Sequence, residues 1–389
     1  MDGGWWKKCV PFVGTGLLAI FVWIFVRRFL FSSSKKEISS SASTAKNSSS
    51  ASSSSSSSLS SSSLSSSSSG ASKAAAKTSD GHPPDSDYVD YAASGSGTRI
   101  AAIFVYPVKG CGGVSLGKSV FNKFGLKYDR EWMVVDAESG DFVTQRQTPK
   151  LATVRVAFDN MESAALSKEL ILSAPGRDEL HVPVFGPKDR PKDRPTRPVR
   201  VWNFEGPAED EGDAAAAWFS AVVERPVRLV RMPEKHARTV DANFAVQGAQ
   251  NVVSFVDGFP LLVATCASVD DIGARSGFRV AAARFRPNLL VATSDGTPFA
   301  EDRWREITIG KNNIPLVAAD GCQRCKVPTI NQVTAAADGD AIGKALLQFR
   351  SRSGEIYFGV NMIHRIERGV IAVGDSVTVQ SQRDAPTFD

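Results

Sequence analysis

The chain has 389 residues, of which 42% are hydrophobic, so it is long enough for one or two domains that bury a core. Its formal net charge is +5, and no run of Lys and Arg alternates with aromatic residues, which argues against a nucleic-acid-binding protein. An odd number of unevenly spaced cysteines argues against a disulfide scaffold and fits a reducing compartment. The cysteines are Cys9, Cys111, Cys266, Cys322 and Cys325.

Residues 1–31 predict a transmembrane anchor. Residues 9–26 carry no charge and would span roughly 27 Å as a helix, close to the roughly 30 Å core of a bilayer. Trp5, Trp6 and Trp23 border this run, where tryptophans favour the membrane interface. More basic residues follow the run than precede it, which predicts that the C-terminal bulk lies in the cytosol. The alternative, a cleaved secretory signal, lacks a small-x-small cleavage site.

Residues 32–96 are dominated by serine and predict a disordered tether. Such a segment cannot bury enough apolar surface to offset its chain entropy. The globular part therefore begins near residue 97. A boundary within residues 231–241 is expected to divide it into two β-rich units.

The first elements of the globular part read as strands. Residues 98–116, TRIAAIFVYPVKGCGGVSL, predict a buried strand that ends in a turn at Pro107 and the following glycines. Residues 130–147 predict a hairpin, because ESGD separates two β-rich segments. Residues 185–201 are rich in proline and charge, which favours a surface loop.

Two helices and a final hairpin complete the predicted elements. DEGDAAAAWFSAVVE (210–224) and TCASVDDIGARSG (265–277) have helical spacing of their apolar residues. GVIAVGDSVTVQ (369–380) reads as strand, turn and strand. With no alternating βαβ pattern and no internal repeat, the fold class is mostly β with some helices (α+β).

Several chemistries are disfavoured by missing motifs. The chain has no GxxxxGK[ST], no GxGxxG after a strand and no GxSxG, so nothing predicts a phosphate-binding loop, a dinucleotide site or a serine hydrolase. The histidines lack metal-ligand spacing and are expected at the surface or in packing. They are His82, His181, His236 and His364.

The segment GCQRCKVPT (321–329) carries the strongest chemical signal. Its two cysteines admit a zinc half-site, a dithiol pair, one reactive thiolate, or two structural thiols. Zinc needs a second ligand pair that the chain lacks, and a thioredoxin-like dithiol would precede a helix rather than a proline. Arg324 and Lys326 adjoin Cys325, and positive neighbours favour a thiolate. Local sequence leaves the thiolate and the structural reading open.

A set of short motifs in fixed order resembles the MOSC family, and more narrowly the mitochondrial amidoxime-reducing component group of molybdenum-cofactor enzymes. The motifs are YPVKGC (106–111), YDREW (128–132), VTQRQTP (143–149), FRPN (285–288), FAEDRW (299–304), CQRCKVPT (322–329) and VGDSV (373–377). The resemblance covers nearly all of residues 97–380. It implies a MOSC N-terminal β-rich domain at 97–235 and a MOSC β-barrel at 236–385, with the molybdenum cofactor (Mo-molybdopterin) between them.

The resemblance also implies site residues. Cys325 occupies the position of the catalytic protein ligand to molybdenum, and Cys322 becomes a bystander. The implied cofactor contacts are Lys109, Gly110, Arg130, Asp257, Gly258, Phe259, Arg286, Gln323, Arg324 and Asn361. The residues alone leave alternatives: an exposed lysine for Lys109, half of a structural ion pair for Arg130 and a cap of local carbonyls for Arg286. Arg146 is either part of the same basic wall or structural.

The implied function is a molybdenum-dependent oxidoreductase that reduces N-hydroxylated compounds such as amidoximes, hydroxylamines and N-hydroxy bases, and extends to nitrite reduction to nitric oxide. The implied electron donors are cytochrome b5 and NADH-cytochrome b5 reductase, since the chain shows no flavin or haem site of its own. The implied location is the mitochondrial outer membrane, with the catalytic part in the cytosol. The alternatives are a sulfur carrier with a persulfide on Cys325 and a non-catalytic carrier of the cofactor. Gly110, Gly258, Phe259 and Asn361 depart from the residues of animal members, which leaves substrate preference open.

Overall fold

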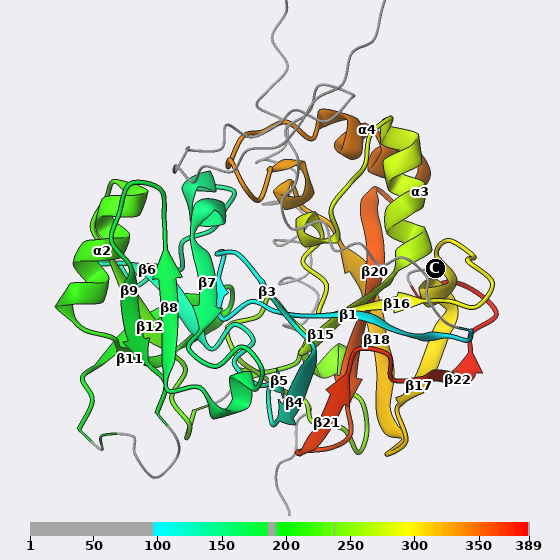
Figure 1. Ribbon diagram of the computed structural model, residues 1–389, viewed down its shortest axis with the longest axis horizontal. Helices are drawn as coiled ribbons and strands as arrows, with labels where there is room; N and C mark the ends of the chain where they lie inside the picture. Colours follow the sequence, from blue (N-terminus) through cyan, green and yellow to red (C-terminus); the bar gives the residue numbers. More distant parts are fainter. Residues whose placement is uncertain (1–95, 186–190, 192, 237, 388–389) are drawn as a thin grey trace, which may run out of the picture. The chain divides into compact units, whose positions relative to one another are not determined.

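The computed structural model describes residues 96–387 apart from 186–190, 192 and 237 (Figure 1). These residues belong to one compact unit. The expected anchor at 1–31 and almost all of the expected tether at 32–96 lie outside the described residues. Within the described part, no helix is long and apolar enough to cross a membrane.

Strands dominate the described residues, as the sequence predicts, and three α-helices accompany them. Helices α2 and α3 lie where they are expected. The third helix, α4, was not expected, because its preceding TAAADGD reads as a turn and Gly343 interrupts its apolar pattern. The helices are α2 (Asp213–Val223), α3 (Cys266–Ser276) and α4 (Asp340–Phe349).

The largest sheet has nine strands in the order β22-β17-β18-β20-β15-β16-β1-β3, with β19 paired to β20. Its centre is the parallel pair β15 and β16, whose LLVAT and LLVA segments are buried throughout. The strands are β1 (Arg99–Val105), β3 (Val114–Leu116), β15 (Leu261–Thr265), β16 (Leu289–Ala292), β17 (Trp304–Ile309), β18 (Ile314–Gln323), β19 (Ser351–Arg352), β20 (Glu355–His364) and β22 (Val377–Gln382).

Strand β1 closes this sheet into a ring. It pairs with β16 on one side, and on the other side Ile100 N donates to Asp375 O at 2.9 Å. Gly374 N donates back to Ile100 O at 2.9 Å, and Val377 N donates to Thr98 O at 2.9 Å. The first described strand therefore lies beside the start of the last strand, β22 (Figure 1).

A second sheet has five strands in the order β10-β11-β12-β6-β2. It contains the expected hairpin, since Asp136 N donates to Asp141 O across the ESGD turn. The expectation of a surface loop over 185–201 is wrong for residues 196–201, which form β10. Pro198 is accommodated because β10 is an edge strand. The strands are β2 (Val108–Lys109), β6 (Trp132–Asp136), β10 (Thr196–Val201), β11 (Phe204–Asp210) and β12 (Val227–Arg231).

Short sheets and 3₁₀ helices fill the remainder. Strand β21 near the C-terminus pairs with β4, which ties distant parts of the chain together. The short strands are β4 (Lys118–Asn122), β5 (Gly125–Leu126), β7 (Arg155–Phe158), β8 (Glu169–Ser173), β9 (Leu180–Pro183), β13 (Arg238–Thr239), β14 (Val252–Val253) and β21 (Gly369–Ala372). The 3₁₀ helices are η1 (Pro149–Thr153), η2 (Ala164–Leu166), η3 (Ala242–Phe244), η4 (Ala282–Arg284), η5 (Ala300–Arg303) and η6 (Val327–Thr329).

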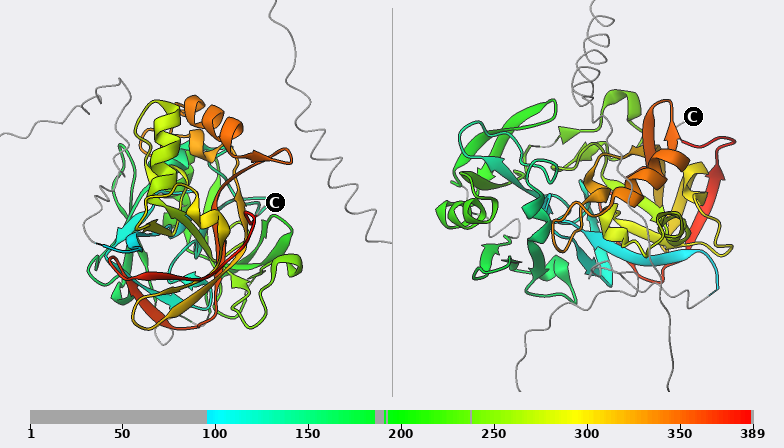
Figure 2. Two further views of the ribbon diagram at one scale, coloured as in Figure 1. Left: turned by 90° about the vertical axis from the view of Figure 1, so that its right-hand side faces the viewer. Right: turned by 90° about the horizontal axis from the view of Figure 1, so that it is seen from above.

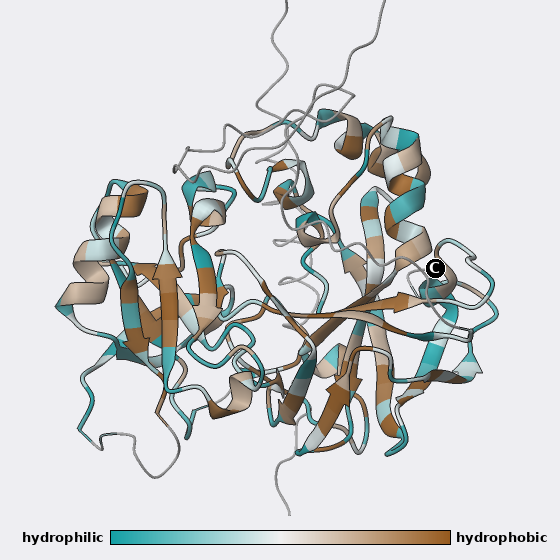
Figure 3. Cartoon of the chain, viewed as in Figure 1, coloured by the Kyte–Doolittle hydropathy of each residue, from teal (hydrophilic) through white to brown (hydrophobic). Residues whose placement is uncertain are grey.

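The apolar core follows the strands (Figure 3). Helices α3 and α4 pack against each other (Figure 2). Helix α3 begins where the Thr265 side chain accepts a hydrogen bond from Ser268 N, and it ends at Gly277, whose φ of 78° suits glycine. Strand β1 belongs to the nine-stranded sheet, because it pairs with β16. The sequence assigns β1 to the first domain, residues 97–235. The domain boundary at 235/236 stays a prediction.

Candidate functional site

The site begins with Lys109, which ends β2 and points at the loop before β15. Its Nζ donates to Phe255 O at 2.8 Å and to Asp257 Oδ1 at 2.6 Å. The residue is only 9% exposed, so the interpretation of Lys109 as an exposed lysine is wrong. Lys109 instead fastens the β2 end to the loop that contains Asp257, Gly258 and Phe259.

The two partners of this ion pair lie in different surroundings. Burial lowers the pKa of Lys109 more than Asp257 raises it. Burial would raise the pKa of Asp257, but Lys109 and the Trp202 indole together hold that pKa well below its usual range. Protein atoms crowd around Asp257, yet its side chain is 77% exposed. We take the pair as ionised, because its atoms lie 2.6 Å apart and water reaches the carboxylate.

Arg238, which sequence reasoning missed, bonds to the backbone of the loop at residues 254–257. Its Nη1 donates to Ser254 O at 3.1 Å and to Val256 O at 2.5 Å, and its Nη2 donates to Asp257 O at 3.4 Å. The side chain is buried. No motif marks Arg238, because it lies in a polar stretch that reads as a domain boundary.

Arg130 and Arg286 form the second part of the site, and both guanidinium groups lie close to the Tyr106 ring. Each guanidinium carbon lies 4.2 Å from the centroid of the Tyr106 ring. Both arginines have positive φ, 49° for Arg130 and 58° for Arg286, a conformation that costs free energy for any residue except glycine. The positions of both side chains therefore depend on a backbone conformation that lowers the stability of the fold.

The two arginines differ in how well their charge is compensated. Arg130 Nη1 contacts both oxygens of Asp129, at 2.7 and 2.6 Å, so the ion pair expected as one reading is present. Arg286 Nη1 donates to the Cys111 carbonyl at 2.7 Å, 175 residues away in sequence, and not to a carbonyl of its own turn as the capping interpretation expects. Arg286 Nη2, however, is buried and has no hydrogen-bond partner among the described residues. Burial, and then the nearby Arg130 charge, lower the pKa of Arg286 to about 10.

The cysteine turn follows β18 and supplies the third part. Arg324 Nη1 contacts Cys322 Sγ at 3.0 Å, and its Nη2 donates to Phe285 O at 2.9 Å, next to Arg286. The guanidinium that the sequence placed beside Cys325 thus engages Cys322. Burial raises the pKa of Cys322, although the Arg324 guanidinium partly offsets this rise. Cys325 itself is exposed.

Other expected residues lie around these parts with varied roles. Gly110 has a φ of 86° and its carbonyl accepts from Gln145 Nε2 at 2.6 Å. A Cβ on Gly258 would meet no atom within 4 Å, so this position borders open space. The Arg146 guanidinium lies 5.1 Å from the centroid of Trp202, whose Nε1 donates to Asp257 Oδ1 at 3.1 Å.

Three expected residues have their contacts elsewhere. The Phe259 ring packs against Phe244, with centroids 5.7 Å apart. Gln323 Nε2 donates to the Tyr357 hydroxyl at 3.4 Å. Asn361 lies in β20 opposite Leu262 and Asp320. The structure therefore brings Lys109, Asp257, Arg130, Arg286 and Arg324 together more closely than these three.

The charges of the cluster favour an anionic ligand. Lys109, Arg130, Arg286 and Arg324 face two carboxylates, those of Asp129 and Asp257, so cations are in excess. Arg286 Nη2 and Arg324 Nε are buried and have no hydrogen-bond partner among the described residues. Among residues 96–387, no group of three or more His, Cys, Asp or Glu converges as a metal site. An anion with several oxygens and a metal that takes Cys325 as its protein ligand would match these donors.

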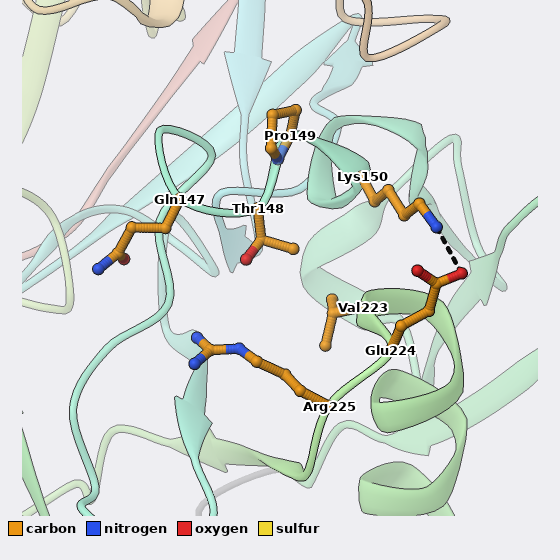
Figure 4. A pocket seen from close by; sticks show the side chains of 7 residues that line it. All are labelled: Gln147, Thr148, Pro149, Lys150, Val223, Glu224 and Arg225. Carbon is orange, nitrogen blue, oxygen red and sulfur yellow. Dashed lines mark ion pairs between the residues drawn. The ribbon is translucent and has the colours of Figure 1, made fainter.

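A separate pocket of about 420 Å³ lies between η1 and the C-terminal end of α2 (Figure 4). It is bordered by an exposed ion pair in which Lys150 Nζ lies 2.6 Å from Glu224 Oε1. Its lining residues are Gln147, Thr148, Pro149, Lys150, Val223, Glu224 and Arg225. None of them is an expected site residue, and the unpaired guanidinium nitrogens lie elsewhere, so we do not place the site in this pocket.

Comparison with known proteins identifies the family. Residues 97–226 match the MOSC N-terminal beta barrel domain, and residues 250–378 match the MOSC domain. The chain is similar to mitochondrial amidoxime-reducing component 1 of Mus musculus, with 30% identity over 299 residues that cover 73% of this chain and 82% of that protein. Mitochondrial amidoxime reducing component 2 of Homo sapiens is 30% identical over 300 residues, covering 72% and 82%.

A second group of relatives is longer than this chain. Molybdenum cofactor sulfurase of Oryza sativa subsp. japonica is 28% identical over 284 residues, which cover 68% of this chain and 32% of that protein. Together the two family matches span the segments that build the arginine cluster and the cysteine turn. The chain therefore belongs to the MOSC-domain family, in which the mitochondrial amidoxime-reducing components are among its relatives.

Proposed function

We propose that this protein is a molybdenum-cofactor-dependent reductase of N-hydroxylated compounds: amidoximes, hydroxylamines and N-hydroxy bases, with nitrite as a further substrate. The observation that carries the proposal is the surplus of buried cations beside an exposed thiol. Arg286 Nη2 and Arg324 Nε lack partners, and Cys325 lies on the same turn as Arg324. Relatives named amidoxime-reducing components support the reaction class.

The residues fit the cofactor on their own chemistry. A pterin phosphate offers several oxygen acceptors, and buried guanidinium N–H groups are strong donors to such oxygens. The open space beside Gly258 leaves room that a side chain at this position would narrow. A thiolate is a good ligand for a soft or borderline metal. When bound, the molybdenum cofactor supplies the two-electron chemistry that removes oxygen from nitrogen.

The chain's own residues then bind and orient. Arg286 and Arg324 would hold the anionic part of the cofactor, and Arg130 keeps Arg286 in place through its bond from Nη2 to Arg286 O at 3.2 Å. Lys109 and Arg238 fix the backbone of the loop at residues 254–257. Cys325 would be the protein ligand to the metal. Cys322, whose thiol is engaged by Arg324, would support the turn without binding the metal.

Partners and location are part of the proposal. The electrons would come from cytochrome b5, itself reduced by NADH-cytochrome b5 reductase, since the chain would hold no second redox group. The N-terminal segment would anchor the protein to the mitochondrial outer membrane with the catalytic part in the cytosol. The word mitochondrial in the names of the relatives supports this location.

The test is the metal and pterin content of the full-length chain, purified in detergent from a host that makes the cofactor. We expect near-stoichiometric molybdenum and pterin, lost or labile in Cys325→Ser and retained in Cys322→Ser. Benzamidoxime reduction with NADH, cytochrome b5 and its reductase should follow the same order. Absence of molybdenum from folded wild type would contradict the proposal and favour a sulfur carrier. Retained cofactor without turnover would favour a non-catalytic carrier, and equal losses in both variants would overturn the single-thiolate assignment.

A further inference from the structure

Trp202 is an exposed tryptophan in a backbone position that does not suit it. It occupies the first residue of the two-residue turn between β10 and β11, where Val201 pairs with Phe204. Its φ is 53°, whereas Asn203 is not among the positive-φ residues. A two-residue hairpin turn with positive φ at its first position favours glycine. The side chain nevertheless remains 45% exposed, so burial does not explain the residue.

The contacts of Trp202 direct its ring to the candidate site. Its Nε1 donates to Asp257 Oδ1 at 3.1 Å, the oxygen that also receives Lys109. Phe142 supports the indole from the side, with centroids 5.0 Å apart and an interplanar angle of 59°. Arg146 lies 5.1 Å from the ring centroid. The other oxygen of Asp257, Oδ2, has no hydrogen bond to a described residue.

Aromatic side chains continue beyond Asp257 along the same loop. Gly258 borders open space, and the next residue, Phe259, packs edge to face with Phe244, which is 39% exposed. Trp202 bonds to Asp257, and Phe259, two residues further along the same loop, packs against Phe244; we call these four residues the aromatic rim. It combines apolar ring faces with one accessible carboxylate oxygen.

The positive charge around the aromatic rim favours neutral planar ligands over cationic ones. Lys109, Arg146 and Arg238 lie near Asp257, so the local sum is positive even with the carboxylate ionised. A cationic aromatic ligand is repelled, whereas a neutral one that donates an O–H or N–H to Asp257 is not. An amidoxime is neutral at pH 7. Its two-electron, two-proton reduction breaks the N–O bond, releases water and leaves an amidine, which takes up a proton and becomes a cation.

We propose that the aromatic rim binds the aryl group of a neutral, planar N-hydroxylated substrate through Trp202 and Phe259, while the substrate donates to Asp257 Oδ2. This inference rests on the proposed reductase function and names its preferred substrates: aryl amidoximes over alkyl ones. The positive surroundings then favour release of the charged amidine product. Trp202 is a specificity-determining residue, and it takes no part in the chemical step.

The test is equilibrium binding by calorimetry to the full-length, cofactor-loaded protein in detergent, without reductant, so that no turnover occurs. The ligands are benzamidoxime, acetamidoxime and benzamidine. The variants are Trp202→Gly, which suits the φ of 53° and removes the ring, and Trp202→Phe, which keeps a ring but not the indole N–H. Trp218→Phe is the matched control, because Trp218 lies on α2 and its Nε1 bonds to Asp178 O.

We expect Trp202→Gly to weaken benzamidoxime binding roughly three- to tenfold, the range of one aromatic contact. Acetamidoxime binding should change less than about twofold, and Trp202→Phe should lie between wild type and Trp202→Gly. Benzamidine should bind more weakly than benzamidoxime, and added salt should narrow that gap. Equal weakening of aryl and alkyl ligands, or no weakening of either, would overturn the rim.

The result separates the rim from the proposed function. Trp202-dependent binding of benzamidoxime without any turnover in the complete NADH system would support the rim and contradict the reductase. Turnover of both amidoximes that responds equally to Trp202→Gly would support the reductase and contradict the rim. Under turnover, the rim also predicts that Trp202→Gly raises KM for benzamidoxime with little change in kcat.

Discussion

The Arg350–Asp302 pair and the candidate site around Arg286 both contain buried arginine nitrogens. They differ in how many of these nitrogens have a hydrogen-bond acceptor, and an arginine whose nitrogens have acceptors is called matched. Beneath η5, Arg350 Nη2 contacts both oxygens of Asp302, at 2.9 and 2.7 Å, and its Nε donates to Tyr357 O at 3.0 Å. In the candidate site, the Arg286 side chain makes one hydrogen bond to a described residue, to the Cys111 carbonyl, and its Nη2 is buried without one.

The difference separates a structural ion pair from a binding site. A buried arginine with a matched carboxylate contributes to holding its neighbours in register, because removal of either partner leaves a buried charge. A buried arginine with unused donors lowers the stability of the free protein and gains when an anion arrives. Burial alone therefore does not identify functional arginines in this fold, and unused donors do so only where they coincide with motif residues, because Arg383 Nε is also buried without a hydrogen bond to a described residue.

The largest expected effect comes from breaking the matched pair. Arg350→Met leaves the Asp302 carboxylate buried without its partner, so the free energy of unfolding should fall by about 3–5 kcal/mol. Urea denaturation of the full chain measures it. Arg305→Met, at an exposed position of β17, is the control and should change stability by less than about 0.5 kcal/mol. A loss below about 1 kcal/mol for Arg350→Met would remove the contrast between the two clusters.

The same substitution in the unmatched cluster should act on the cofactor instead of the fold. Arg286→Met removes a desolvated cation along with one hydrogen bond, so cofactor-free protein should change stability by less than about 1 kcal/mol. Loss of charge-assisted bonds should lower bound pterin more than about tenfold. Released-pterin fluorescence and urea denaturation give the two values. A stability loss as large as that of Arg350→Met would make Arg286 structural.

Unused donors should also respond to a simple anion. Inorganic phosphate at constant ionic strength should raise the Tm of cofactor-free wild type by about 2 °C, since a ligand that binds only the folded state stabilises it. Arg286→Met should abolish the shift. Chloride at matched ionic strength is the reference, and an equal phosphate effect in the variant would assign the shift to other sites.

The smallest expected effect comes from His364, a buried side chain that can lose its proton and become neutral, which an arginine does not do. His364 at the end of β20 is fully buried, its Nε2 has no partner, and burial lowers its pKa from the ordinary 6.5. The unfolded chain therefore binds this proton more readily. Stability from His364 is complete above pH 6.5 and is lost as the pH falls, by at most about 1.4 kcal/mol per pH unit.

Denaturation series between pH 7.5 and 5 check this sign. His364→Phe removes the titrating group in an apolar position beside Phe121, so its pH dependence should be shallower than that of wild type. An identical slope in both proteins would show that other groups dominate. The comparison explains why an unmatched histidine needs no ligand, whereas an unmatched arginine, which keeps its charge, does.

The sequence predicted the first strand, the ESGD hairpin, the final strand-turn-strand segment and two helices because their patterns are local. The hairpin around ESGD and helices α2 and α3 carry their own turn, capping and periodicity signals. Helix α4 and strand β10 were not predicted, since Gly343 weakens one pattern and Pro198 the other. Helix α4 depends on packing against α3, which is distant in sequence, whereas β10 pairs with the neighbouring β11 across a two-residue turn.

The site divided in the same way. Lys109, Arg130, Arg286 and the cysteine turn were found through motif resemblance, and their roles as ligands stay predictions. Arg238 and Trp202 were missed, because a buried arginine in a polar stretch and a tryptophan in a hairpin turn have no local pattern that reveals their partners. Arg324 adjoins Cys325 in sequence but contacts Cys322, since successive residues of a turn point in different directions.

The closure of the ring by β1 has a consequence for how the protein is made. Ile100 and its partner Asp375 are bonded across almost the whole globular part, so the ring is incomplete until the last strands have left the ribosome. Such sequence-distant pairing predicts slow folding, while the hairpin of β10 and β11 completes early. Until then residues 98–100 have no strand beside them on that side, and a chain cut before residue 374 would leave this short edge open to other chains.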